Sequence, residues 1–134
     1  LSAQKIDVVR DLEEVISDFK MYKIDLESIV INMLTNSFEA LKRTAEKKIF
    51  ISCREEEDHI KVIFQDNGSG IPQELNPNIF SPFFTTKDNG VGLGLSIVRD
   101  IVVKYNGSIE SYNSSEHGGA TFEFIFKKEK NYGS

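Results

Sequence analysis

Cysteine, proline and tryptophan are scarce in this chain of 134 residues, and long apolar runs are missing. The single cysteine, Cys53, excludes an internal disulfide, fits a reducing compartment and is interpreted as a small apolar strand residue. No apolar run approaches the roughly 20 residues that span a bilayer. No signal-peptide pattern opens the chain, which begins with Leu1 rather than methionine. We therefore expect a cytoplasmic domain excised from a longer protein, or a processed chain.

An excess of negative charge limits the partners that this chain attracts. The formal net charge of −5 argues against nucleic acid or an anionic membrane surface as the main partner. A small phosphate ligand remains compatible, because a metal ion, backbone amides and a few cations can meet its charge locally. The hydrophobic content of 40% suits one domain with a single core.

Hydrophobic periodicity predicts an α/β two-layer sandwich. Apolar residues at helical spacing predict three helices, over 6–19, 25–45 and 93–105. Alternating patterns predict four strands, over 48–54, 59–65, 108–113 and 120–127. The pair Asn106-Gly107 predicts a left-handed end to the last helix.

The chain divides into three parts on these patterns. We expect an N-terminal helix and linker over 1–24, a core over 25–127 and a frayed tail over 128–134. Within the core, 74–89 carries two of the three prolines and little periodicity. A loop of that length inside a compact domain is usually functional.

A polar stripe borders the buried face of the helix predicted over 25–45. Asn32, Asn36, Glu39 and Arg43 fall on this stripe. Such a stripe either faces a ligand or forms a solvated edge. The buried face itself is predicted to contain Leu26, Ile29, Val30, Met33, Leu34, Ser37 and Leu41.

Two glycine-rich segments surround the long loop. Asp66-Asn67-Gly68-Ser69-Gly70 follows a strand, and Gly90-Val91-Gly92-Leu93-Gly94 leads into a helix. Glycines let a backbone approach a ligand closely, and a helix N-terminus attracts phosphate oxygens. Alternating glycines alone also fit a flexible hinge, and Asp-Asn-Gly alone fits a simple turn.

Five segments carry a more specific pattern. In order they are Asn32-Met33-Leu34-Thr35-Asn36-Ser37, Asp66-x-Gly68-x-Gly70, Phe80-Ser81-Pro82-Phe83-Phe84-Thr85-Thr86-Lys87, Gly90-x-Gly92-Leu93-Gly94-Leu95-Ser96-Ile97-Val98 and Gly119-Ala120-Thr121-Phe122. They resemble the N, G1, F, G2 and last glycine boxes of the gyrase, heat-shock-90, histidine kinase and MutL ATPase superfamily. The third and fourth segments resemble sensor histidine kinases in particular, and the resemblance covers about residues 25–127.

The resemblance implies a Bergerat-type fold, with a mixed β-sheet packed against about three helices and an ATP lid over 74–91. It implies that ATP and Mg²⁺ bind, with Asn36 as the metal ligand. Asp66 would accept the adenine amino group, since an ionised carboxylate only accepts hydrogen bonds. Thr121 would support the base, and Lys87 would reach the γ-phosphate or remain a surface lysine. The other residues implied in nucleotide binding are Gly68, Gly70, Thr86, Gly90, Gly92, Leu93, Gly94 and Leu95.

Asn32 indicates which reaction the site would catalyse. In the hydrolases of this superfamily, a glutamate one turn before the metal-binding asparagine activates water. The Asn32 amide cannot accept a proton at neutral pH. Asn32 and Asn36 are thus the candidate catalytic residues of a histidine kinase, in which a histidine attacks the γ-phosphate in line.

Three departures from the family pattern qualify this interpretation. No histidine here has the setting of a phospho-acceptor, so the acceptor is expected upstream of Leu1 or on another chain. The opening strand of such domains is weak or missing, with Met21-Tyr22-Lys23-Ile24 as its only candidate. Glu39 occupies a position at which many kinases carry a cation, and Arg43 is a possible substitute.

The resemblance also implies partners. They are the helical phospho-acceptor domain of the same or a second protomer, and a response regulator downstream. A membrane would be contacted only through missing parts of the full-length protein, as in a receptor with a cytoplasmic kinase. Two alternatives stay open, namely an ATP-switched interaction module without kinase activity and an anti-sigma serine kinase.

Overall fold

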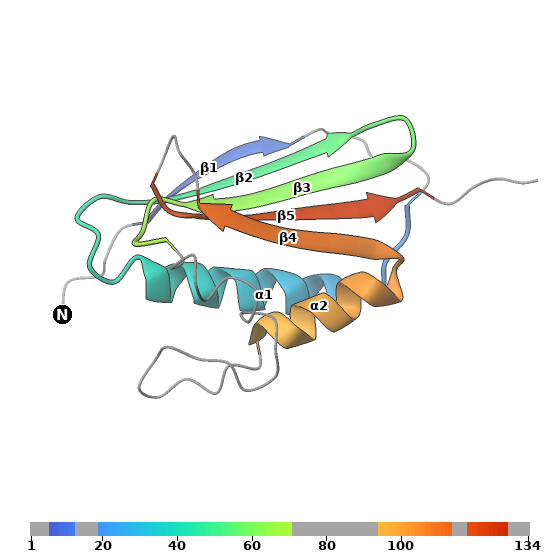
Figure 1. The fold of residues 1–134 in the computed structure, drawn as a ribbon, viewed down its shortest axis with the longest axis horizontal. Helices are drawn as coiled ribbons and strands as arrows, with labels where there is room; N and C mark the ends of the chain where they lie inside the picture. Colours follow the sequence, from blue (N-terminus) through green and yellow to red (C-terminus); the bar gives the residue numbers. More distant parts are fainter. Residues whose placement is uncertain (1–5, 13–18, 71–93, 114–117, 129–134) are drawn as a thin grey trace, which may run out of the picture.

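The computed structural model describes residues 6–12, 19–70, 94–113 and 118–128. Two helices and five strands lie in these ranges, and Figure 1 shows them as two layers. The helices are α1 (Lys23–Ala40) and α2 (Gly94–Lys104). The strands are β1 (Ile6–Leu12), β2 (Lys47–Glu55), β3 (His59–Asp66), β4 (Gly107–Asn113) and β5 (Ala120–Lys127).

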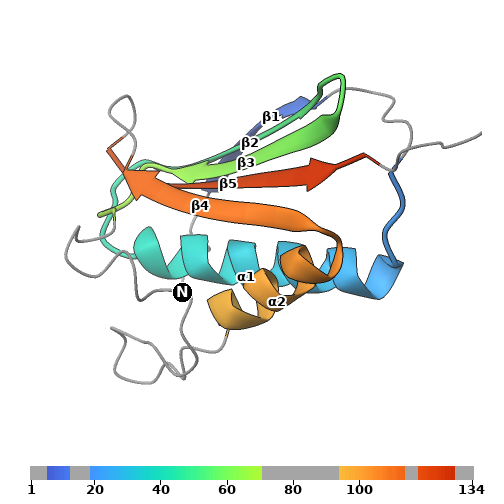
Figure 2. The same ribbon diagram turned by 45° about the vertical axis from the view of Figure 1, so that its right-hand side comes forward.

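The five strands form one mixed sheet in the order β1-β2-β3-β5-β4. β1 is parallel to β2, and all other neighbours are antiparallel. β2 and β3 form the predicted hairpin, in which Glu56 N donates to His59 O at 2.8 Å. Both helices cover the same face of the sheet, as Figures 1 and 2 show. The two-layer α/β sandwich and its mixed sheet are confirmed, with two helices in the described residues.

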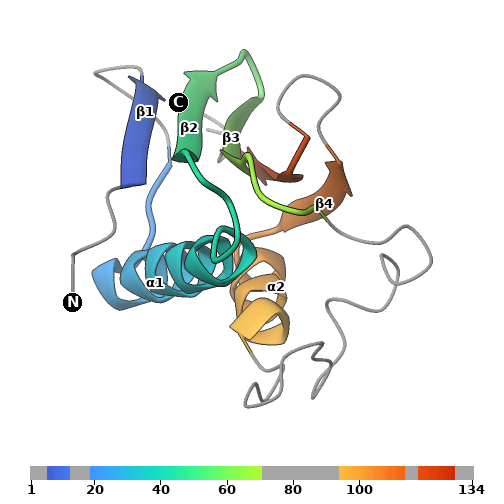
Figure 3. The ribbon, with the colours of Figure 1, turned by 90° about the vertical axis from the view of Figure 1, so that its left-hand side faces the viewer.

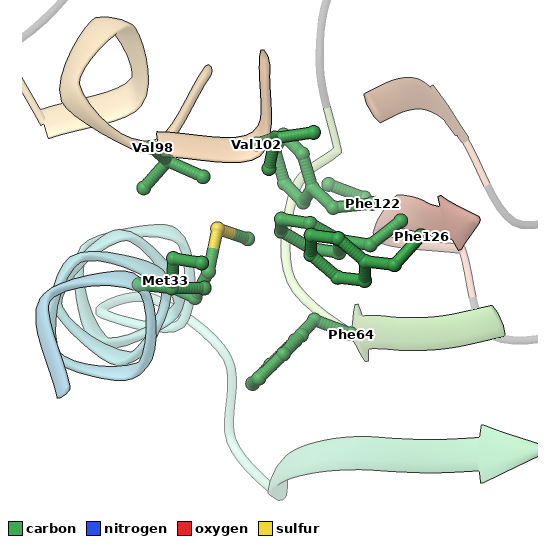
Figure 4. Packing of buried hydrophobic residues seen from close by; sticks show 9 residues of the cluster. Met33, Phe64, Val98, Val102, Phe122 and Phe126 are labelled. Atoms are coloured by element: carbon green, nitrogen blue, oxygen red, sulfur yellow. The ribbon is translucent and has the colours of Figure 1, made fainter. Parts of the chain in front are cut away.

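The core lies between the helices and this face of the sheet. Figure 4 shows Met33 of α1 and Val102 of α2 beside the aromatic rings of β3 and β5, with Val98 of α2 directed toward Met33. These helical side chains have no exposed surface. The cluster of buried residues is Ile29, Met33, Phe64, Val98, Val102, Ala120, Phe122, Phe124 and Phe126.

The helical face predicted on α1 is largely confirmed. Ile29, Met33, Ser37 and Leu41 are buried, whereas Leu26 in the first turn is half exposed. The predicted left-handed end of the last helix is also confirmed, because Asn106 has a φ of 58°.

The helix predicted over 6–19 is wrong where the structure describes it, because Ile6–Leu12 is strand β1. Its apolar residues fit helical spacing, but pairing with β2 decides the outcome. β-Branched residues such as Val8 and Val9 favour an extended backbone once a neighbouring strand accepts it. The opening strand of the domain is therefore this segment. Met21 and Tyr22 instead lead into α1.

The two helices run in opposite directions. Asp25 near the start of α1 contacts Lys104 at the end of α2, and Asn32 lies against Gly94 at the start of α2. The N-terminus of α2 therefore points along the second half of α1. In Figure 3 the viewer faces the end of the molecule where α1 finishes and α2 begins. The glycine-flanked end of β3 lies at this same end.

Candidate functional site

Asp66, the last residue of β3, is a carboxylate placed almost entirely inside the protein. Its exposed fraction is 2%. Its Oδ1 accepts hydrogen bonds from the backbone N–H groups of Gly68 at 2.9 Å and Ala120 at 3.3 Å. Both donors reach the same oxygen, so within the described residues Oδ2 has lone pairs for a further donor. The arrangement suits a carboxylate that recognises an N–H group of a ligand.

The electrostatics of Asp66 follow from this burial. Desolvation raises the pKa of the Asp66 carboxyl above its ordinary value, and the N–H groups of Gly68 and Ala120 oppose the increase. Buried carboxylates with raised pKa values are concentrated at functional sites. The carboxyl thus has a solvation deficit that a ligand donating hydrogen bonds would reduce.

Two glycines make room for this carboxylate. A Cβ on Gly119 would lie 2.1 Å from the backbone oxygen of Asp66 and 2.4 Å from its Oδ1. A Cβ on Gly68 would lie 2.4 Å from the carbonyl oxygen of Ala40, at the end of α1. Real Cβ atoms do not come this close, and backbone oxygens cannot move aside cheaply. The glycines therefore let β3, β5 and α1 approach one another around Asp66.

Gly70 needs glycine for another reason. Its φ is 79°, in the left-handed region that favours glycine. The predicted glycine turn after β3 is thus built from a close approach at Gly68 and a left-handed backbone at Gly70.

Asn67 is a supporting residue that the sequence reasoning missed. Its Oδ1 accepts a hydrogen bond from Lys48 N at 2.9 Å, and its Nδ2 donates to Glu46 O at 2.7 Å. Its own N–H donates to Lys48 O at 3.2 Å. These bonds fasten the turn to the start of β2. The available signal was the Asn-Gly pair, whose asparagine often bonds to nearby backbone.

The polar stripe of α1 connects the two glycine segments. Asn32 donates from Nδ2 to Ser28 O at 2.7 Å, and a Cβ on Gly94 would lie 2.9 Å from its Oδ1. Two turns later, Ala40 lies against Gly68. Eight residues of helix separate Asn32 from Ala40 by about 12 Å. Asn36 is half-buried midway between them.

Thr121 is not brought to the Asp66 carboxylate. Its side chain is 1% exposed, and its Oγ1 accepts a hydrogen bond from Gln65 Nε2 at 2.7 Å. Gln65 and Thr121 are paired across β3 and β5, and successive strand residues point to opposite faces. The hydroxyl of Thr121 therefore lies on the other face of the sheet from Asp66. Ala120, through its N–H, is the β5 residue that contacts Asp66.

Several predicted binding residues fall outside the described part of the chain. They are Thr86, Lys87, Gly90, Gly92 and Leu93, and the expected lid over 74–91 lies there too. Gly94 begins α2, and Leu95 packs its side chain against the core cluster. The N-terminus of α2 therefore follows the second glycine segment directly, as its sequence predicted.

The described residues contain no group of three or more histidine, cysteine, aspartate or glutamate side chains that could hold a metal ion. In the same part of the chain, neither helix has the length and apolar character to cross a membrane.

Comparison with known sequences identifies related proteins. Residues 21–130 match the family of histidine kinase-, DNA gyrase B- and HSP90-like ATPases. C4-dicarboxylate transport sensor protein DctB of Rhizobium meliloti is 39% identical over 106 residues, 79% of this chain and 17% of DctB. Sensor protein FixL of Bradyrhizobium diazoefficiens is 35% identical over 76% of this chain and 20% of FixL. The chain thus spans about a fifth of the length of these curated relatives.

Solved structures show the same fold. The catalytic domain of histidine kinase ThkA has a TM-score of 0.80 and 32% sequence identity, covering 92% of this chain and 80% of that chain. ThkA has also been solved in complex with response regulator protein TrrA. The family match, the order of the five motifs along this chain and the fold shared with ThkA all agree with the arrangement found around Asp66. The chain belongs to the histidine kinase-, DNA gyrase B- and HSP90-like ATPase family, as an ATP-binding catalytic domain of the histidine kinase type.

Proposed function

We propose that this domain binds Mg-ATP between Asp66 and the N-terminus of α2 and transfers the γ-phosphoryl group to a histidine outside residues 1–134. The observation that carries the proposal is the buried Asp66 carboxylate, whose two hydrogen bonds from the described residues both go to Oδ1. Oδ2 is then placed to accept the exocyclic amine of adenine. A base that donates this hydrogen bond would reduce the cost of burying the carboxylate.

The phosphates belong at the opposite end of the α1 stripe. The first amides of α2 lack helical partners and carry partial positive charge, so they bind phosphate oxygens. Gly94 lies against Asn32, and the turn that follows Asp66 lies against Ala40. Asn32 and Ala40 are about 12 Å apart along α1. Gly68 and Gly70 would pass beside the base. We propose that Thr86, Lys87, Gly90, Gly92, Leu93 and Leu95 complete the phosphate site.

The residues present fit a magnesium ion shared with the phosphates. Mg²⁺ prefers oxygen ligands and usually keeps one or two protein ligands together with substrate phosphates and water. Asn36, midway along the stripe, would supply its amide oxygen. Bound there, the ion would neutralise charge on the phosphates.

Asn32 directs the reaction away from water. An amide in this position cannot remove a proton from water, and its Nδ2 is already engaged with Ser28 O. A positioned imidazole needs no such base, because its neutral nitrogen is itself the nucleophile. We therefore propose a histidine as acceptor, carried by a helical domain of the same or a second protomer.

The likeness to sensor kinases supports further partners for the whole protein. The complex of ThkA with TrrA supports a response regulator as the downstream acceptor. We propose that this domain acts in the cytoplasm, whether or not the full-length protein is a membrane receptor.

Nucleotide binding by this chain and phosphotransfer by the full-length protein test the proposal separately. Calorimetric titration with Mg-ATP should give binding that Asn36→Ala reduces at least tenfold. Thr35→Ala, an exposed neighbour on another face of α1, is the matched control and should bind normally. Equal affinity of Asn36→Ala and the parent chain would reject the metal role.

Radiolabelled ATP identifies the acceptor. With the full-length protein, acid-labile and base-stable label on histidine is expected, and Asn32→Glu should increase ATP hydrolysis. Label on serine would favour the anti-sigma kinase alternative. Nucleotide binding without any label would favour the switch module.

A further inference from the structure

We propose that Glu39 reads the ribose of the bound nucleotide, accepting hydrogen bonds from its hydroxyl groups and so selecting ribonucleotides. This inference rests on the proposed ATP site. Glu39 lies on the polar stripe of α1, and the proposed metal and phosphate contacts do not involve it.

The order of contacts along α1 gives the direction in which a nucleotide would lie. Asn32 contacts Gly94 at the start of α2, and Ala40 contacts Gly68 beside the Asp66 turn. Phosphates therefore belong near Asn32 and the base near Ala40. Glu39 directly precedes Ala40 and lies about two turns, or roughly 10 Å, beyond Asn32 on the same stripe. This places Glu39 near the base end, where the ribose joins the base.

The charge of Glu39 argues against a phosphate contact. Two anions at close range repel each other, and the N-terminus of α2 offers the phosphates a favourable alternative about two turns away. An ionised carboxylate is only an acceptor, so its ligand partner must donate hydrogen bonds. In a nucleotide, the donors outside the base are the 2′ and 3′ hydroxyl groups of the ribose.

The side chain of Glu39 is held in a position from which it can accept such bonds. Its Oε1 lies 3.1 Å from the Nζ of Lys42, which is three residues later and just past the end of α1. The side chain of Glu39 is 34% exposed, whereas that of Lys42 is 69% exposed. The lysine thus orients the carboxylate from the solvent side and reduces its repulsion toward the triphosphate. Lone pairs on both carboxylate oxygens remain for the two ribose hydroxyls.

The test compares ATP with 2′-deoxyATP and 3′-deoxyATP, each bound to this chain and followed by calorimetry. The parent chain should bind ATP about tenfold more tightly than a deoxynucleotide, as expected for a lost hydrogen bond to a charged group. Glu39→Ala should weaken ATP binding about tenfold and remove the preference. Glu27→Ala is the matched control, because Glu27 also pairs with a lysine on α1, Lys23, near its other end.

Each outcome separates this inference from the proposed function. If ATP binds but deoxynucleotides bind equally well, the ribose role is overturned while the ATP site stands. If Glu39→Ala weakens all three nucleotides equally, and only when Mg²⁺ is present, Glu39 acts at the metal and the ribose role is again overturned. If no nucleotide binds the parent chain, both proposals fail. Circular dichroism of Glu39→Ala should match that of the parent chain, and Glu39→Gln gives a second variant of closer shape.

Discussion

The start and the finish of α1 each lie beside a carboxylate, and the two carboxylates accept hydrogen bonds from different kinds of donor. At its start, Asp25 Oδ2 accepts hydrogen bonds from Tyr105 at 2.5 Å and Lys104 at 2.9 Å, and Tyr22 N donates to Tyr105 Oη at 3.0 Å. The Lys104 ammonium also lies over the tyrosine rings of Tyr22 and Tyr105. Near its finish, Asp66 accepts hydrogen bonds from the backbone N–H groups of Gly68 and Ala120, and glycines make room for its carboxylate.

The difference separates a structural use of a carboxylate from a functional one. Asp25 accepts its hydrogen bonds from the side chains of Lys104 and Tyr105, which fasten the start of α1 to the end of α2. Asp66 is 2% exposed and accepts its hydrogen bonds from the backbone N–H groups of Gly68 and Ala120. A carboxylate paired with a lysine side chain at a partly solvated site stabilises the fold, whereas a buried carboxylate bonded to backbone N–H groups gains more from a ligand that donates a hydrogen bond. Mutations near Asp66 should therefore change nucleotide affinity, whereas mutations near Asp25 should change stability.

Asp66→Asn should produce the largest effect, on nucleotide affinity. The N–H groups of Gly68 and Ala120 would hold the amide oxygen of the new side chain, which leaves its NH₂ group facing the adenine amine. Donor then meets donor, so ATP affinity should fall about 100-fold, equivalent to roughly 3 kcal/mol. Calorimetry measures the affinity, and thermal melting near neutral pH should show a Tm no lower than that of the parent chain, because the variant no longer buries a charge. Normal ATP affinity in a folded variant would contradict the role of Asp66.

Gly119→Ala should disturb the same end of the molecule through sterics. Its Cβ would lie 2.1 Å from the Asp66 backbone oxygen, so the strands must separate, at a cost of about 1–3 kcal/mol in unfolding free energy. Urea unfolding and ATP titration should both show the loss. Gly118→Ala is the control, because no atom of the described residues, its chain neighbours aside, lies within 4 Å of its Cβ. Its φ of 81° makes alanine strained by about 1 kcal/mol, but ATP affinity should persist.

The two carboxylates should give opposite dependences of stability on pH. Hydrogen bonds from Tyr105 and Lys104 lower the pKa of Asp25, so its contribution is present above the ordinary carboxyl pKa and is lost as pH falls through the lowered value. Burial raises the pKa of Asp66, so its contribution is present below the ordinary carboxyl pKa and is lost as pH rises through the raised value. Urea unfolding of Asp25→Asn, Asp66→Asn and the parent chain between about pH 3 and pH 6 measures both. Difference profiles of the same sign would contradict this assignment.

Tyr105→Phe should have the smallest effect, confined to stability. The variant keeps the ring but loses the hydroxyl that bridges Tyr22 N and Asp25. The Tm should fall by roughly 3–5 °C, as expected for two lost hydrogen bonds at a partly solvated site. ATP affinity should stay within about twofold, because Gly94 lies against Asn32 near the middle of α1 and the Asp66 turn lies against Ala40 at its finish, both away from Tyr105. A large loss of affinity at full folding would show that the two ends are coupled.

Local patterns in the sequence predicted most of the fold. Alternation predicted β2, β3, β4 and β5, and helical spacing predicted α1 and α2 to within a few residues, except that α1 ends earlier, at Ala40. The failure at Ile6–Leu12 has a physical reason. A short apolar segment fits either period, and only the parallel pairing with β2 selects the strand.

The candidate site was predictable in its residue types but not in its contacts. The motifs identified Asp66, Gly68 and Gly94, because their chemistry is visible in the residues themselves. They did not reveal that Ala120 N–H, rather than the Thr121 hydroxyl, reaches Asp66. The face on which a strand residue lies depends on register, and one step along the strand reverses it.

By itself, the sequence determined the helices, most strands, the glycine turns and the family to which the chain belongs. These features depend on neighbouring residues and on side-chain chemistry, both of which are local. Only the tertiary structure decided that β1 joins the sheet, that α2 points its N-terminus along α1, and that the Asp66 carboxylate is buried with one oxygen held. These outcomes depend on contacts between segments far apart in the chain, and their energies exist only once the layers have packed.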